Sequence, residues 1–207
     1  PAATAQPAPF TSADNVRARA LVWLSEQELP SGGFADSQGL ISPNNTSSVW
    51  QLLSTLPASE VSDFHAQAAL TAMQPAFEPW LAARDSGPLA RAVLGVTATG
   101  GDPHQAAGLD LLAELWANYD AQTGFFHPES FFRHLLSVQA LIASGETVPE
   151  AALAAMGHAQ IADGSWSWRI STDSATVGDV DTTAQALITL AAAGVGADDS
   201  RVQAALG

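Results

Sequence analysis

DGSWSWRISTDSATVGDVDTTAQALITLAAAG, residues 163–194, is the stretch that decides the fold prediction. It begins with an Asp-Gly turn and two tryptophans, continues through a polar loop, and ends in a segment that is apolar on almost every face and stops at Gly194. A polar loop, an apolar run and a terminal glycine are typical of a chain that turns into a buried helix.

Parts of this pattern recur upstream, about every 45 residues. Three segments align with QALITLAAAG at 185–194: RAVLGVTATG at 91–100, QALIASG at 139–145 and WQLL at 50–53. The alignment places residues 51, 91, 139 and 185 at one repeat position. Three of the four units carry a Gly-aromatic turn before this segment, at 33–34, 124–125 and 164–166. Such a period predicts helix pairs stacked side by side, with the more apolar helix of each pair on the inside.

The whole chain is predicted to be all-α, because no segment alternates with period two for long enough to form a confident strand. Residues 1–12 are a Pro/Ala-rich linker, and residues 13–207 form one repeat domain. Asp181 or Thr182 is expected to cap the helix that ends at Gly194. Pro75 to Pro79 are expected to break the chain. The remaining helices are expected from Ser12–Asp14 to before Leu29, then at 46–56, from Ser59 or Ser62 to Met73, at 89–99, 103–119, 129–144 and 149–160, and from Asp199 or Ser200 onward.

Composition narrows the function classes. Twenty-one acidic residues face seven arginines and no lysine, so the formal net charge is −14 and binding to nucleic acid or to anionic lipid is not expected. Cysteine is absent, which excludes disulfides and thiolate zinc sites. The sequence contains no run of about 18 apolar residues, so a membrane span is not expected. The opening PAATAQPAPFTS is typical of a linker or of a mature N-terminus after processing, and the second interpretation favours an extracellular or cell-surface protein.

Several of these motifs resemble a known family. WLSEQ at 23–27, SGGF at 31–34, DGSW at 163–166 and TAQAL at 183–187 are similar to the prenyltransferase and squalene oxidase repeat of terpenoid cyclases and protein prenyltransferases. The resemblance implies an α/α toroid whose inner helices surround a central cavity. A closed ring of six pairs needs about 270 residues at this period, so this chain is expected to form a toroid or partial toroid of about four to five helical hairpins.

The family's catalytic motifs are only partly present. Without cysteine, neither the zinc site of protein prenyltransferases nor a complement-type thioester can be assembled. Class II terpene cyclases protonate an alkene through Asp-x-Asp-Asp, and DVDT at 179–182 keeps only its first two aspartates. The resemblance makes Asp181 the candidate proton donor, with Asp179 as its partner. The simpler interpretation is that Asp181 caps the inner helix.

The same stretch offers two candidate binding sites. Trp166 and Trp168 would face the same way in an extended segment, either as a surface that stacks on a ligand or as two plugs between neighbouring hairpins. Asp173, Asp179 and Asp181 lie in an oxygen-rich loop, where calcium is an alternative to a solvated loop with a helix cap. No other metal site or cofactor is predicted.

Two histidines lie in GFFHPESFFRH at 124–134. His127 is expected before a helix and His134 within it, and their spacing is not that of an HExxH zinc motif. Packing and capping are therefore the simpler interpretation of both, with a metal or acid–base role as the alternative.

These features favour a non-catalytic, secreted binding or assembly module. The open ring would leave apolar helix edges that invite self-association or a protein partner. One alternative is a class II terpene cyclase-like enzyme, or part of one, that uses Asp181. A second is a carrier of an apolar small molecule that resembles cobalamin binders.

Overall fold

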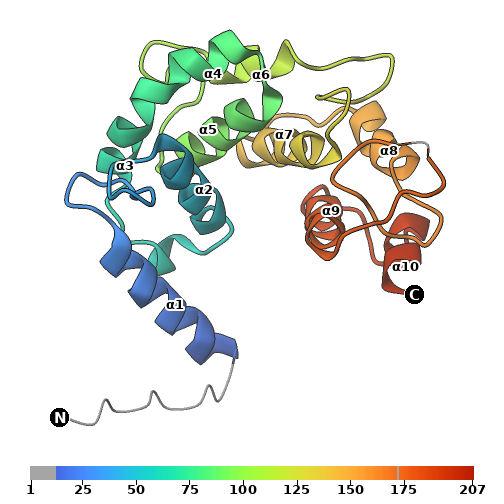
Figure 1. Ribbon diagram of the computed structural model, residues 1–207, viewed down its shortest axis with the longest axis horizontal. Helices are drawn as coiled ribbons and strands as arrows, with labels where there is room; N and C mark the ends of the chain where they lie inside the picture. Colours follow the sequence, from blue (N-terminus) through green and yellow to red (C-terminus); the bar gives the residue numbers. More distant parts are fainter. Residues whose placement is uncertain (1–12, 172) are drawn as a thin grey trace.

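The computed structural model describes residues 13–171 and 173–207. The predicted linker at 1–12, with the candidate cap Ser12, lies outside them. Within the described residues the chain is all-α, as predicted: the regular elements are helices, and extended pairing is limited to isolated bridges (Figure 1). None of the described helices is both long enough and apolar enough to cross a bilayer.

The helices follow one another as short elements joined by loops. In chain order they are α1 (Ala13–Gln27), α2 (Pro43–Leu53), α3 (Ala66–Met73), α4 (Phe77–Ala83), α5 (Ser86–Ala98), α6 (Leu111–Trp116), α7 (Phe131–Ala143), α8 (Glu150–His158), α9 (Val180–Ala192) and α10 (Ser200–Leu206). Two single 3-10 turns are added, η1 (Ala58–Glu60) and η2 (Gln74–Ala76).

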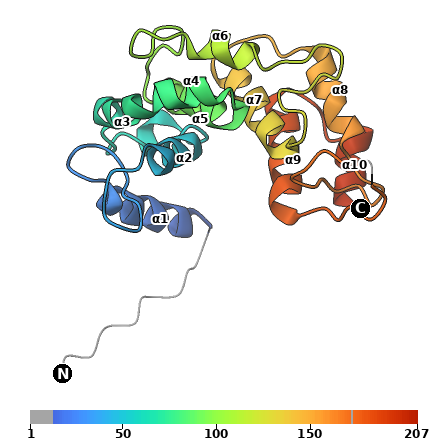
Figure 2. The same ribbon diagram turned by 45° about the horizontal axis from the view of Figure 1, so that its top comes forward.

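An inner row of helices organises the molecule. α2 packs on α5, α5 on α7 and α7 on α9, while the other helices flank this row. Figures 1 and 2 show the resulting arc, which is open on one side, with α1 at one end and α9 and α10 at the other. Most of α5 and α7 is buried, as predicted for the inner helix of each pair. The curvature gives the inner row one concave face that is shared by helices far apart in sequence.

The last three inner helices carry the same end signals. Each has 13 residues and begins after a side chain that accepts a hydrogen bond from the backbone of the first turn: Asp85, Ser130 and Asp179. Each ends two residues before a glycine with positive φ, at Gly100, Gly145 and Gly194. A glycine takes this left-handed conformation at little cost, so the matched terminal glycines do mark matched helix ends.

These caps correct the register of the sequence alignment. Residues 51, 91, 139 and 185 do not share one repeat position. Counted from the caps, Arg91 is equivalent to Leu136 and Gln185, whereas Gln139 is equivalent to Leu94 and Ile188. α2 begins after its cap Ser42, which makes Gln51 equivalent to Leu94 rather than to Arg91. The alignment slipped by about one helical turn, which leaves all four residues on the same face of their helices.

Three glycines join each unit to the next: Gly124 and Gly164 of the predicted turns, and Gly32, which lies one residue before the predicted turn at 33–34. Gly32, Gly124 and Gly164 all have positive φ. A side chain at these positions would meet Ala68 of α3, Ala151 of α8 and Ala204 of α10, respectively. Each turn therefore lies directly against the outer helix of the following unit, and only glycine allows that approach. This repeated joint supports the prediction of stacked hairpins.

Three predicted elements differ from the structure. The break expected at Pro75 to Pro79 is limited to the single 3-10 turn η2, which contains Pro75 and separates α3 from α4, while Pro79 lies in the first turn of α4, where a missing N–H costs nothing. The helix expected at 103–119 is limited to α6, since Ala107 and Gly108 both have positive φ. α3 begins after His65, without the serine cap that was expected from Ser59 or Ser62.

Candidate functional site

The two candidate catalytic aspartates differ in environment. Asp179 is the cap of α9: its Oδ1 accepts from the N–H of Thr182 at 2.7 Å, and its Oδ2 accepts from the N–H of Trp168 at 3.0 Å. Asp181 lies in the first turn of α9 and is exposed. The prediction that Asp181 or Thr182 caps the helix is therefore wrong, because Asp179 occupies that place. Asp181 lacks the burial that would keep a carboxyl group protonated.

The two candidate tryptophans point to different places. Trp166 is fully buried, its Nε1 donates to the carbonyl of Met156 at 2.7 Å, and its ring stacks on Phe131 with centroids 6.3 Å apart. Trp168 is 51% exposed. The expectation that both rings share one surface is therefore wrong. Trp166 is a plug between α7, α8 and α9, and only Trp168 is available to a ligand.

The three aspartates proposed for calcium do not form a cluster. Among the described residues, no group of three or more His, Cys, Asp or Glu side chains is arranged to hold a metal ion. Asp173 accepts from the N–H of Ala175 at 2.9 Å, which closes its own turn. Asp179 is engaged at the start of α9, as described above. The loop at 171–181 thus uses these two carboxylates to hold its own backbone.

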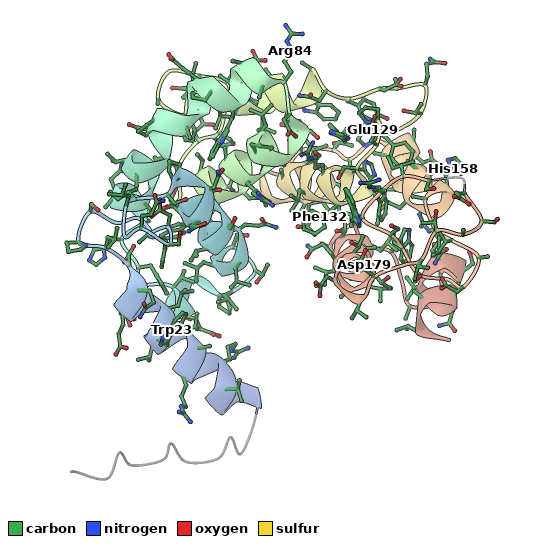
Figure 3. All side chains as sticks on the ribbon, in the orientation of Figure 1. Trp23, Arg84, Glu129, Phe132, His158 and Asp179 are labelled. Atoms are coloured by element: carbon green, nitrogen blue, oxygen red, sulfur yellow. The ribbon has the colours of Figure 1, made fainter. Side chains whose placement is uncertain are left out.

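A different site lies at the N-terminal ends of α5 and α7, on the concave side of the arc. It is a cavity of about 750 Å³, called here the arginine pocket. Its polar lining includes three of the seven arginines of the chain, and its walls include Phe132 at the start of α7 (Figure 3). The residues that matter for its chemistry are Arg91, His127, Phe132, Arg133, Trp168 and Arg169. Its concentration of guanidinium groups contrasts with the formal net charge of −14 for the whole chain.

Arg91 is the least satisfied of these groups. It extends from the middle of α5 and is partly buried. Within the part of the chain that the structure describes, its guanidinium has neither a hydrogen-bond acceptor nor an ion-pair partner. Burial, reinforced by the nearby charge of Arg133, lowers the pKa of Arg91 below its ordinary value. A guanidinium remains charged at neutral pH even so, so Arg91 presents a cation that no described residue neutralises by direct contact.

His127 and Arg133 are in direct contact on one wall of the pocket. Nδ1 of His127 accepts from the N–H groups of Glu129 and Ser130 at 3.1 and 2.9 Å. Burial, with the charge of Arg133, lowers the pKa of His127, so its ring is neutral at pH 7 and carries its proton on Nε2. Nη1 of Arg133 lies 2.9 Å from that same Nε2. The contact places an imidazole nitrogen and a guanidinium group side by side on one wall of the arginine pocket.

Two further contacts fix the shape of the pocket. Nη1 of Arg133 lies 3.1 Å from Oδ2 of Asp85, the cap of α5, which ties α7 to α5. The guanidinium of Arg169 lies 4.2 Å from the ring centroid of Trp168. The backbone around Arg169 bridges to that of Ser130, so this stacked pair is held against the start of α7. The stacking leaves the edge of the Arg169 guanidinium free to donate.

A second hollow continues along the concave face from the arginine pocket. This concave groove, of about 730 Å³, is lined by one row of residues from each inner helix, including Gln51, Leu94, Gln139, Ile142, Gln185 and Ile188. On α5, Leu94 lies one turn beyond Arg91, and on α7, Gln139 lies one turn beyond Leu136 of the arginine pocket. The cationic pocket and the groove are therefore neighbouring parts of one surface.

Sequence reasoning missed the arginine pocket. Arg91, Arg133 and Arg169 come from three different repeat units and meet only because the units curve around one face. His127 was considered only for packing, capping, or a metal or acid–base role. The signal that could have drawn attention to the site is the choice of arginine for every basic residue of an acidic chain.

Comparison with known protein families, curated proteins and solved structures finds no match to this chain.

Proposed function

We propose that this protein is a non-catalytic binding module, built as a partial α/α toroid, which holds an anionic group in the arginine pocket. The observation that carries the proposal is the convergence of positive charge in one cavity: Arg91, which has no hydrogen-bond acceptor among the described residues, lies there together with Arg133 and Arg169. Carboxylate, sulfate and phosphate are the groups that guanidinium donors bind best, because each can accept two parallel hydrogen bonds.

The state of the aspartates supports a non-catalytic role. Both oxygens of Asp179 are engaged by backbone N–H groups, and Asp181 is exposed to solvent. A proton donor to an alkene needs a carboxyl group that burial keeps neutral, and neither aspartate has that setting. The partial toroid is supported by the inner row of helices, by their repeated caps and by the repeated glycine joints.

The charges of the pocket indicate a ligand with one or two negative charges. Three arginines are offset by Asp85, which pairs with Arg133, and by the exposed Glu129 at the rim. The net charge of −14 repels anions at a distance, but salt screens that repulsion beyond about 8 Å at physiological ionic strength. Recognition must therefore come from direct hydrogen bonds at short range.

Isothermal titration calorimetry with sulfate, phosphate and glutarate tests this proposal directly. At low chloride we expect at least one of these anions to bind with a Kd in the millimolar range or tighter, and Arg91→Gln to weaken binding about tenfold or more. Arg84→Gln is the matched control, because Arg84 is exposed at the outer edge of the arc (Figure 3). Equal affinities in the two variants, or no binding of any of the three anions, would contradict the proposal.

Assembly through α1 is a second candidate, favoured by one observation. Val22 and Trp23 of α1 are 59% and 61% exposed, at the end of the arc. Large apolar side chains that lie together on an end helix are typical of a contact with another chain. Light scattering over a concentration series should then show dimers or larger species, and Trp23→Ser should shift them to monomers. A monomer at every concentration would exclude self-association through this face.

A further inference from the structure

The concave face carries a regular mixture of hydrogen-bonding and aliphatic side chains. Each inner helix contributes at least one long polar side chain to this face: Gln51 from α2, Arg91 from α5, Arg133 and Gln139 from α7, and Gln185 from α9. Aliphatic side chains lie between them, and two of these, Leu52 and Ile188, are 57% and 53% exposed. The face is therefore neither a purely apolar channel nor an ordinary polar surface.

Two of the amide side chains have no hydrogen-bond partner among the described residues. Nε2 of Gln139 donates to Oγ1 of Thr189 at 2.7 Å, which fixes one rung between α7 and α9. The side-chain amides of Gln51 and Gln185, both partly buried, make no hydrogen bond within the described part of the chain. Each of these amides offers a carbonyl acceptor and two donors, which is the complement of a peptide unit.

This mixture distinguishes between two kinds of occupant. A hydrocarbon tail laid over the groove would bury Leu94 and Ile142 favourably, but it would also cover the glutamine amides without giving them partners, at a substantial desolvation cost. An extended polypeptide satisfies both the amides and the aliphatic side chains of the groove. Its backbone presents hydrogen-bond donors and acceptors to the amides, and its side chains pack on the aliphatic residues. The adjoining arginine pocket selects an acidic side chain by charge complementarity.

We infer that the arginine pocket and the concave groove together bind an extended peptide segment of a partner protein, with an Asp or Glu of that segment held by Arg91. This inference rests on the anion binding proposed above. It identifies the bound anion as the carboxylate of an acidic side chain in the partner protein. The acidic side chain lies in the arginine pocket, and the flanking residues cross the inner helices toward α9 and α2. The curvature of stacked helix pairs provides concave binding surfaces of this kind.

The dimensions fit a short segment. Neighbouring packed helices lie about 8–10 Å apart, so a path from α2 to α9 crosses three such intervals, or about 24–30 Å. An extended chain advances about 3.3 Å per residue, which gives about eight residues of contact. A segment of this length crosses all four inner helices and contacts a polar side chain on each of them. It also places aliphatic side chains on Leu94, Ile142 and Ile188.

Selection from a displayed library of random peptides about ten residues long tests the inference, with the full chain as bait. We expect the enriched sequences to share one Asp or Glu at a fixed position, flanked by aliphatic residues. Synthetic peptides of those sequences should lose about tenfold or more in affinity when that acid is changed to its amide, or when the bait carries Arg91→Gln. The matched control Arg84→Gln should change nothing.

Gln185→Ala separates the groove from the pocket. We expect it to weaken the selected peptides about fivefold or more while leaving glutarate binding unchanged, because glutarate reaches only the arginine pocket. If glutarate binds but no acidic peptide is enriched, or if Gln185→Ala leaves peptide affinity intact, the peptide inference is wrong and the anion pocket stands. Dodecanoate that binds more than tenfold tighter than acetate, and is unaffected by Gln185→Ala, would overturn the inference in favour of a lipid. If neither glutarate nor any peptide binds, both proposals fail.

Discussion

The aspartate loop at 171–181 and the arginine pocket meet at Trp168, whose N–H donates to Asp179 and whose ring lines the pocket. On the loop side, the carboxylates of Asp173 and Asp179 accept hydrogen bonds from the loop and from the helix that follows. On the pocket side, Arg91 has no hydrogen-bond acceptor among the described residues. The comparison teaches that the partners of a polar group, more than its identity, show whether it is free to bind something else.

The two tryptophans beside this boundary should give the largest difference. Trp166→Ala should lower the free energy of unfolding by about 3–5 kcal/mol, because it removes a fully buried ring and the hydrogen bond to Met156. Trp168→Ala should lower it by about 1 kcal/mol or less, since half of that ring is already exposed. Urea unfolding followed by circular dichroism measures both. Similar losses for the two variants would contradict the assignment of Trp166 to the core and of Trp168 to the wall of the arginine pocket.

Two histidines make the same comparison within α7 and the turn before it. Nδ1 of His134 accepts from the N–H of Phe126 at 3.4 Å, and its Nε2 lies 3.1 Å from the carbonyl of Ala152. His134 is thus satisfied at both ring nitrogens as a neutral ring, whereas Nε2 of the less buried His127 lies against the guanidinium of Arg133. The pKa values of both histidines are lowered, but the larger shift belongs to the fully buried His134, so its titration should have the larger effect on stability.

Burial lowers the pKa of His134 from 6.5 to about 4. The unfolded chain therefore binds a proton before the folded chain does, and stability contributed by the neutral ring is lost as the pH falls from 6.5 toward 4. The loss should reach about 3 kcal/mol. Urea unfolding at pH 7.5, 5.5 and 4.5, compared with His134→Gln, isolates this contribution from that of the carboxylates. The variant should show a shallower dependence on pH, and an unchanged slope would contradict the assignment.

The aspartates provide a smaller test. Asp179→Ala should lower the free energy of unfolding by about 1–2 kcal/mol, because it removes the cap of α9 and leaves the N–H of Trp168 without its partner. Asp181→Ala is the matched control, and as an exposed first-turn residue it should cost about 0.5 kcal/mol or less. Thermal unfolding followed by calorimetry compares the two. A larger loss for Asp181 would restore it as the structural cap.

The sequence was sufficient to predict an all-α chain and the ends of several inner helices, because both follow from local signals. Gly145 and Gly194 end inner helices as predicted, and the Gly-aromatic turns recur at the joints between units. The register of Gln139 was wrong because that segment stops one turn sooner after its glutamine than the others do. Asp179 and Asp181 are both suitable caps by type, and only the geometry of the chain entering α9 selects Asp179.

The candidate site was not predictable in the same way. Arg91 and Arg133 come from different units, and nothing local indicates that both face the same cavity. The prediction that the rings of Trp166 and Trp168 face the same way was also wrong. The backbone that follows Trp168 pairs with the residue before α7, so the segment is not one straight strand. Sites that depend on the curvature of a whole arc become visible only when the units are placed in space.

One measurement tests the central claim most directly: the difference in unfolding free energy between the natural chain and Arg91→Gln, with and without glutarate. In chloride alone, Arg91→Gln should be as stable as the natural chain or more stable by about 0.5 kcal/mol, because it removes a partly buried cation that lies near Arg133. With glutarate at about 100 times its Kd, the natural chain should gain about 2.7 kcal/mol and become the more stable of the two. If Arg91→Gln is less stable by the same margin in both buffers, Arg91 is a structural residue and the arginine pocket is not a binding site.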